Sequence, residues 1–203
     1  MSISIFLILF FTIIISGSLV FLFKTTEKNL KLLLAFSGAY LLTISFVDIM
    51  PEIYNKPSKY IGVFILIGFL IQILLEFLTK GIEHGHLHKS ESIEASKLTL
   101  IMGICLHSFL EGMSLSENVA SIQLRNSLLV GVIIHNIPIS IVFISMLLHS
   151  NVKKVNIIYL FLLFALATPL GTIAGNHLDV LNVNTLANFS NIILALVVGI
   201  FLH

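Results

Sequence analysis

Long apolar runs are the feature that most constrains what this chain can fold into. A helix needs roughly 20 mostly apolar residues to cross about 30 Å of hydrocarbon, and the sequence holds seven runs of about that length. They cover residues 3–23, 32–50, 60–79, 98–117, 127–149, 155–175 and 186–203. Each should be a helix, because a segment crossing lipid must satisfy its own backbone hydrogen bonds. The sequence therefore predicts an all-α integral membrane protein, a seven-span bundle forming one transmembrane domain over residues 1–203.

The composition excludes several other classes of protein. Hydrophobic residues make up 57% of the 203 residues and charged residues only 10%, whereas an average soluble domain is about 25% charged. The net charge of +1 provides no basic surface for nucleic acid. A single cysteine, Cys105, rules out an intrachain disulfide and a zinc site built from cysteines.

The lysines and arginine predict the orientation in the membrane, because basic residues gather on the cytoplasmic side. Connections after the first, third and fifth runs hold eight of the 11 basic residues, and the other connections hold three. The N-terminus is therefore expected outside. The longest polar connection, residues 80–97, is expected in the cytoplasm, and its His84, His86 and His88 predict loose binding of transition metals.

Two ionisable residues lie near the middle of run 98–117, where short side chains cannot easily reach water. His107 and Glu111 are four residues apart, so they share one helical face. An imidazole and a carboxylate on one face form half of a divalent metal site. A pair that only satisfies itself, or that joins helices, is the alternative interpretation.

The next run carries a similar motif. His135-Asn136-Ile137-Pro138 lies near the middle of 127–149, and Pro138 is expected to break the helix by freeing the carbonyl of Ile134. Residues 107–112 (HSFLEG) align with residues 135–140 (HNIPIS), with Ile139 standing where the first copy has Glu111. Polar or broken segments at matching positions of paired helices point to the substrate site of a transporter.

Two weaker signals lie in other runs. Thr168, followed by Pro169 and Gly171, predicts a kink and offers an oxygen ligand of modest strength. Asp48 and Glu52 flank Met50-Pro51 at the outer end of the second run. Both carboxylates could reach the interface, so a wetted helix end is the simpler interpretation of this pair.

Together these motifs resemble the ZIP (ZRT/IRT-like) family of divalent metal transporters. The matching segments are HSFLEG at 107–112, HNIP at 135–138, TPLG at 168–171, DIMPE at 48–52 and the histidine-rich connection. The resemblance implies an eight-helix, 3+2+3 inverted-repeat fold with the N-terminus outside, and a homodimer. It also implies a metal site between the fourth and fifth helices, with help from the sixth.

The resemblance further implies the roles of individual residues. His107, Glu111 and His135 match ligands of the main metal site, and Ser108, Asn136 and Thr168 match positions that often supply an adjacent one. Asp48 and Glu52 are assigned to the pathway. The chain departs from the family at Ile139 and Thr168, where other members often carry metal-binding side chains, so a single metal site is expected. An eighth helix is not expected within these 203 residues.

The leading functional hypothesis is transport of Zn²⁺ toward the cytoplasm by a protein that is not an enzyme, with Fe²⁺, Mn²⁺ and Cd²⁺ as other possible substrates. A multi-pass location in the plasma (inner) membrane of a bacterium is expected. Two alternatives stay open. A non-transporting sensor or regulatory subunit would explain Ile139 and Thr168. An intramembrane zinc hydrolase would need a general base, and no further carboxylate lies near the middle of the spans to serve as one.

Overall fold

The computed structural model describes residues 3–22, 26–55, 60–79, 94–150, 152–177 and 186–203. Within these ranges every regular element is helical, which confirms the predicted all-α class. The α-helices are α1 (Ile3–Ser18), α2 (Glu27–Ile44), α3 (Met50–Tyr54), α4 (Ile61–Thr79), α5 (Glu94–Ser114), α6 (Ile122–Leu148), α7 (Lys154–His177) and α8 (Leu186–Phe201). A 3₁₀ turn, η1 (Leu19–Phe21), extends α1, and a π-helical turn, η2 (Ser45–Ile49), joins α2 to α3.

Among the described residues, five continuous helical stretches are long and apolar enough to cross a membrane: Ile3–Phe21, Lys28–Tyr54, Ile61–Leu78, Ile122–Leu148 and Lys154–His177. The expected spans 98–117 and 186–203 correspond to α5 and α8, within which Thr99–Ser114 and Phe189–Phe201 are apolar. Run 98–117 ends early because the amides of Leu115 and Ser116 bond back to Gly112 and Met113, which closes tight turns after α5. The protein is thus a multi-pass helical membrane protein.

The expected break at Pro138 is wrong. α6 runs without interruption from Ile122 to Leu148 with Pro138 inside it, and α7 is likewise continuous through Pro169. Proline removes one backbone donor, and the remaining hydrogen bonds hold the helix where no water competes for them. The described helices change their hydrogen-bond pattern instead at η2, just before Pro51, where a missing N–H also disturbs the ladder.

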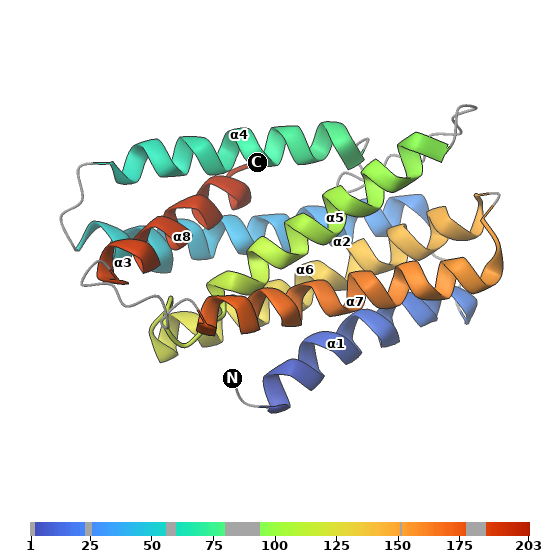
Figure 1. The fold of residues 1–203 in the computed structure, drawn as a ribbon, viewed down its shortest axis with the longest axis horizontal. Helices are drawn as coiled ribbons and strands as arrows, with labels where there is room; N and C mark the ends of the chain where they lie inside the picture. The colour runs from blue at the N-terminus through green and yellow to red at the C-terminus, as the bar shows by residue number, and fades with distance from the viewer. Residues whose placement is uncertain (1–2, 23–25, 56–59, 80–93, 151, 178–185) are drawn as a thin grey trace.

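The helices pack as two related groups (Figure 1). α5 lies against α7 and α8, and α6 lies against α1 and α2. Exchanging α5 with α6, α7 with α1 and α8 with α2 converts one set of neighbours into the other, which is the contact pattern of an internal repeat. α4 runs beside α8 and also contacts α5.

Glycines set the closest of these approaches. A Cβ added to Gly112 of α5 would overlap the carbonyl of Thr168 on α7, and one added to Gly171 of α7 would overlap the carbonyl of Phe109 on α5. The two helices can therefore touch backbone to backbone. This contact is the structural use of Gly171.

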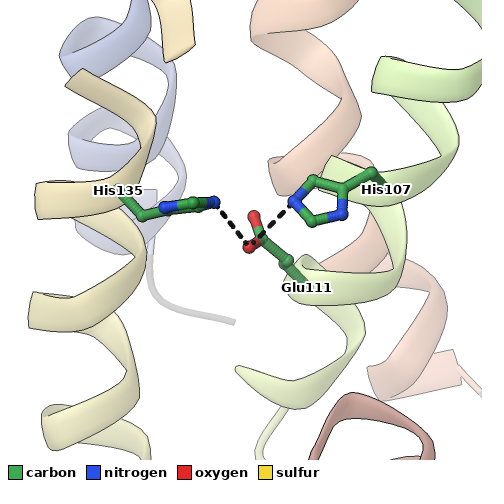
Figure 2. Close-up of side chains that lie close together, drawn as sticks. All are labelled: His107, Glu111 and His135. Carbon is green, nitrogen blue, oxygen red and sulfur yellow. Dashed lines mark ion pairs between the residues drawn. The ribbon is translucent and has the colours of Figure 1, made fainter. Parts of the chain in front are cut away.

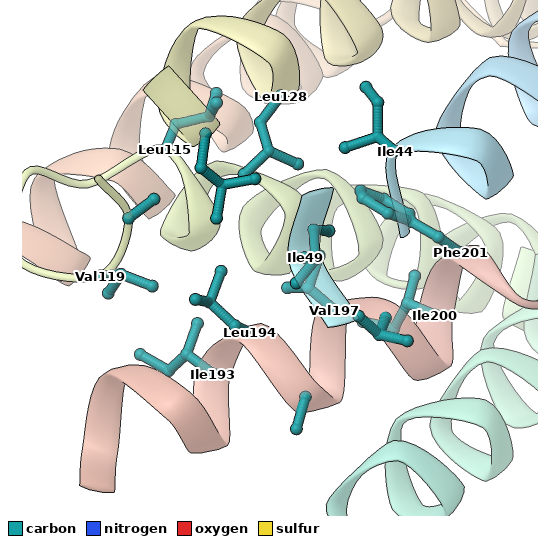
Figure 3. Close-up of a cluster of buried hydrophobic side chains, with 14 of the residues drawn as sticks. Ile44, Ile49, Leu115, Val119, Leu128, Ile193, Leu194, Val197, Ile200 and Phe201 are labelled. Atoms are coloured by element: carbon teal, nitrogen blue, oxygen red, sulfur yellow. The ribbon is translucent and has the colours of Figure 1, made fainter. Parts of the chain in front are cut away.

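Two buried apolar clusters fill the bundle. One joins α8 to η2, α3 and the end of α5, and includes Leu115 and Val132 (Figure 3). The other includes Ile104 of α5 and Ile139 of α6, packed with residues of α1 and α7. His107 and Glu111 lie between Ile104 of the second cluster and Leu115 of the first, which directly follows α5. His135 of α6 lies between Val132 of the first cluster and Ile139 of the second. Apolar packing thus surrounds a polar layer.

Candidate metal site

Three buried side chains from α5 and α6 converge at this polar layer (Figure 2). His107 and Glu111 project from the same face of α5, one turn apart, and His135 faces them from α6. Their exposed fractions are 3%, 0% and 9%. Within the described ranges, these residues form the one group of three or more histidine, cysteine or acidic side chains whose ligand atoms lie within 4.8 Å of one another.

The distances suit a small cation. Nε2 of His107 lies 3.2 Å from Oε1 of Glu111, and Nε2 of His135 lies 3.7 Å from the same oxygen. In a tetrahedral zinc site with bonds of about 2.1 Å, neighbouring ligand atoms are about 3.4 Å apart. The three atoms could therefore close around one ion with small movements. The carboxylate of Glu111 is buried without a lysine or arginine partner in the described part of the chain, and such a charge favours a cation there.

Three further predicted residues are buried on the same helices or on α7. Ser108, Asn136 and Thr168 are each 0% exposed. Among the described residues no hydrogen-bond partner is found for the Ser108 hydroxyl, either amide atom of Asn136, or the Thr168 hydroxyl. An unsatisfied buried polar group is unfavourable by roughly 1–3 kcal/mol. Burial of these polar groups is therefore a cost that nothing in the described part of the chain offsets.

The predicted pathway residues lie apart from the cluster. Asp48 and Glu52 line a cleft of about 410 Å³ at the junction of η2 and α3 with the start of α6, together with Asn55, Ser121 and Gln123. The Ser121 hydroxyl donates to Oε2 of Glu52 at 3.1 Å. His84, His86 and His88 lie outside the described residues.

Two contacts of the histidines were not predicted from the sequence. Nδ1 of His107 lies 2.9 Å from Oε1 of Gln72 on α4, and Nδ1 of His135 lies 3.2 Å from Oγ of Ser37 on α2. Gln72 and Ser37 are 2% and 0% exposed. A buried glutamine in an apolar run is a signal that could have been pursued, whereas a serine in such a run is too common to stand out.

Fold and site together define a class: a multi-pass helical membrane protein with a buried cluster able to hold a divalent metal. The comparisons with known proteins are more specific. The family model described as ZIP Zinc transporter matches residues 83–203, which include α5 to α8 and all three converging side chains. The chain belongs to this family, as its motifs predicted.

Curated relatives agree over a similar region. Zinc transporter ZIP9-B of Xenopus laevis is 30% identical over 124 residues, covering 58% of this chain and 40% of that protein. Zinc transporter ZIP9 of Micropogonias undulatus is 28% identical over 123 residues, covering 57% and 38%. The chain thus matches about two fifths of the length of these relatives.

Proposed function

We propose that this chain carries Zn²⁺ across the membrane toward the cytoplasm, with His107, Glu111 and His135 as the ligands of the moving ion. The observation that carries the proposal is the convergence of these three side chains inside the bundle. Two imidazoles and one carboxylate suit Zn²⁺ better than Mg²⁺ or Ca²⁺, which prefer oxygen ligands. Fe²⁺, Mn²⁺ and Cd²⁺ are competing substrates in this proposal.

Family membership supports transport over the two alternatives. The family model and the relatives named above are described as zinc transporters, which disfavours both a hydrolase and a sensor. Ser108, Asn136 and Thr168 are proposed as oxygen donors beside the main ligands. Their support is complete burial with polar atoms that lack partners in the described part of the chain.

The cleft lined by Asp48 and Glu52 is proposed as the approach for cations from outside. Two carboxylates at a helix end attract cations, and the distribution of basic residues supports an N-terminus outside. In this orientation connection 80–97 lies in the cytoplasm, where His84, His86 and His88 would buffer metal. Replacing all three by serine should leave transport in proteoliposomes intact, and complete loss would contradict this role.

Assembly and location are also proposals. Family resemblance supports a homodimer, which light scattering of the purified protein would test. The expected bacterial plasma membrane has no support from the relatives named above, which are vertebrate. Fractionation of the source cells would decide the location.

Uptake in proteoliposomes tests the central proposal. Wild-type protein should accumulate Zn²⁺, and Fe²⁺, Mn²⁺ or Cd²⁺ should compete if they share the site. Glu111→Gln should abolish uptake because it removes the charge that balances the ion. Glu117→Gln, which changes a half-exposed glutamate beyond the end of the same helix, should not. Metal binding without uptake by the wild type would favour the sensor instead.

A further inference from the structure

The ring nitrogens that face away from Glu111 have buried partners on two other helices. Nδ1 of His107 meets Oε1 of Gln72 from α4 at 2.9 Å, and Nδ1 of His135 meets Oγ of Ser37 from α2 at 3.2 Å. Ser37 and Gln72 both precede the region matched by the family model, residues 83–203. The two histidines of one site are therefore supported from different sides of the bundle.

The surroundings of Ser37 favour one direction for its contact with His135. Its hydroxyl lies 2.9 Å from the carbonyl oxygen of Leu34 and donates to it. A hydroxyl has one hydrogen to donate, and a carbonyl oxygen has none, so this bond uses the only hydrogen of Ser37. Where this bond forms, the oxygen of Ser37 is left to accept in its second contact. Consequently Nδ1 of His135 carries a hydrogen and donates it to Ser37.

The Gln72 contact leads to the same result for the other ring. A side-chain amide oxygen only accepts hydrogen bonds, so Nδ1 of His107 is the donor to Oε1 of Gln72. A neutral imidazole carries one N–H. When a cation lies between the rings and both contacts are made, the lone pair of each neutral ring is on Nε2, the atom 3.2 Å (His107) or 3.7 Å (His135) from Oε1 of Glu111.

We propose that Ser37 and Gln72 are positioning residues that hold His135 and His107 in the tautomer whose Nε2 lone pair is left for a metal beside Glu111. This inference rests on the proposed function for its purpose, since the other tautomer would place a hydrogen where the metal bond must form. The two contacts also connect His135 to α2 and His107 to α4. A hydrogen bond on the second ring nitrogen fixes ring orientation and raises ligand basicity, and its loss typically weakens metal binding about 10–100-fold.

Four variants separate positioning from general structure. Ser37→Ala and Gln72→Met remove the two acceptors with little change of shape, and Ser37→Thr and Gln72→Glu restore them. Ser45→Ala is the matched control, because Ser45 is another fully buried serine that follows α2 and donates to a backbone carbonyl, that of Leu41. None of these residues is proposed to touch the metal.

The first measurement is nitrogen NMR of the Zn²⁺-loaded full chain, labelled with ¹⁵N-histidine, in nanodiscs at neutral pH. His107→Gln and His135→Gln identify the two signals. The wild type should show Nδ1–H for both rings. Ser37→Ala should shift only His135 toward Nε2–H, and Gln72→Met should shift only His107. Ser37→Thr, Gln72→Glu and Ser45→Ala should keep the wild-type tautomers.

The second measurement is the affinity for Zn²⁺ by calorimetry. Ser37→Ala and Gln72→Met should each weaken binding about 10-fold or more, and the conservative variants should recover it. Nε2–H tautomers in the wild type, or unchanged tautomers and affinity in both Ser37→Ala and Gln72→Met, would overturn the inference. Zn²⁺ binding without uptake would instead overturn the proposed transport and leave the positioning role standing, so the two failures can be told apart.

Discussion

The imidazole rings of His107 on α5 and His135 on α6 lie close together, with their centroids 5.9 Å apart and their planes inclined by 58°. The carboxylate of Glu111 lies between their Nε2 atoms (Figure 2). The ligand set is thus divided, with two members on α5 and one on α6. A bound ion would therefore link the two helices, and any movement that separates them would weaken its binding.

Crystals soaked in Zn²⁺ should show one strong anomalous peak at this position. We expect it within about 2.0–2.2 Å of Nε2 of both histidines and of a Glu111 oxygen. Glu111→Gln crystals soaked in the same way should lose the peak. Strong peaks elsewhere, with this position empty in the wild type, would contradict the assignment.

Replacing Asn136 by leucine should separate stability from function. Both amide atoms of Asn136 are buried without a partner in the described part of the chain, so an apolar side chain of similar size should raise the melting temperature of the metal-free protein by removing a penalty of about 1–3 kcal/mol. The same variant should weaken Zn²⁺ binding if the amide oxygen is a donor. A lower melting temperature with unchanged affinity would argue that Asn136 is structural.

Replacing Gly112 by alanine should destabilise the protein, because the new methyl group would overlap the backbone carbonyl of Thr168. Overpacking of this kind is unfavourable by about 1–3 kcal/mol. Gly38→Ala in α2 is the control, since nothing lies within 4 Å of its added Cβ, and it should leave stability unchanged or slightly higher. Thermal unfolding in detergent measures both. Equal melting temperatures would show that α5 and α7 can separate freely.

Replacing Ile139 by glutamate should strengthen Zn²⁺ binding if position 139 faces the metal, as the alignment with Glu111 predicts. Ile139 is 0% exposed within an apolar cluster, so the metal-free variant should melt at a lower temperature, and Zn²⁺ should restore stability. One of two neighbouring carboxylates must hold a proton when no metal is present. Metal binding then releases that proton, so affinity should rise more steeply with pH than in the wild type.

Calorimetry at two pH values tests this prediction, with Ile139→Gln as the control of similar shape that lacks the charge. Unchanged affinity and pH dependence in a folded Ile139→Glu protein would place position 139 in the scaffold. The internal alignment would then describe sequence similarity without a shared role.

Much of the molecule followed from local patterns. The apolar runs determine membrane helices, because lipid leaves the backbone no partner but itself. The spacing of four between His107 and Glu111 determines a shared face, because helical geometry is local. The position of His135 in the middle of an apolar run predicted it as the third ligand, because an ionisable side chain inside a membrane span is costly and usually functional.

Only the tertiary structure decided what each side chain meets on other helices. That Ser37 and Gln72 would contact the two histidines depends on how α2 packs on α6 and α4 on α5, and spacing within one helix carries no such information. Helix continuity through Pro138 and the contact of α5 with α7 through Gly112 and Gly171 were settled in the same way. Packing between helices fixes these features, because it can hold a helix together across a missing donor and can require a small residue that local propensity disfavours.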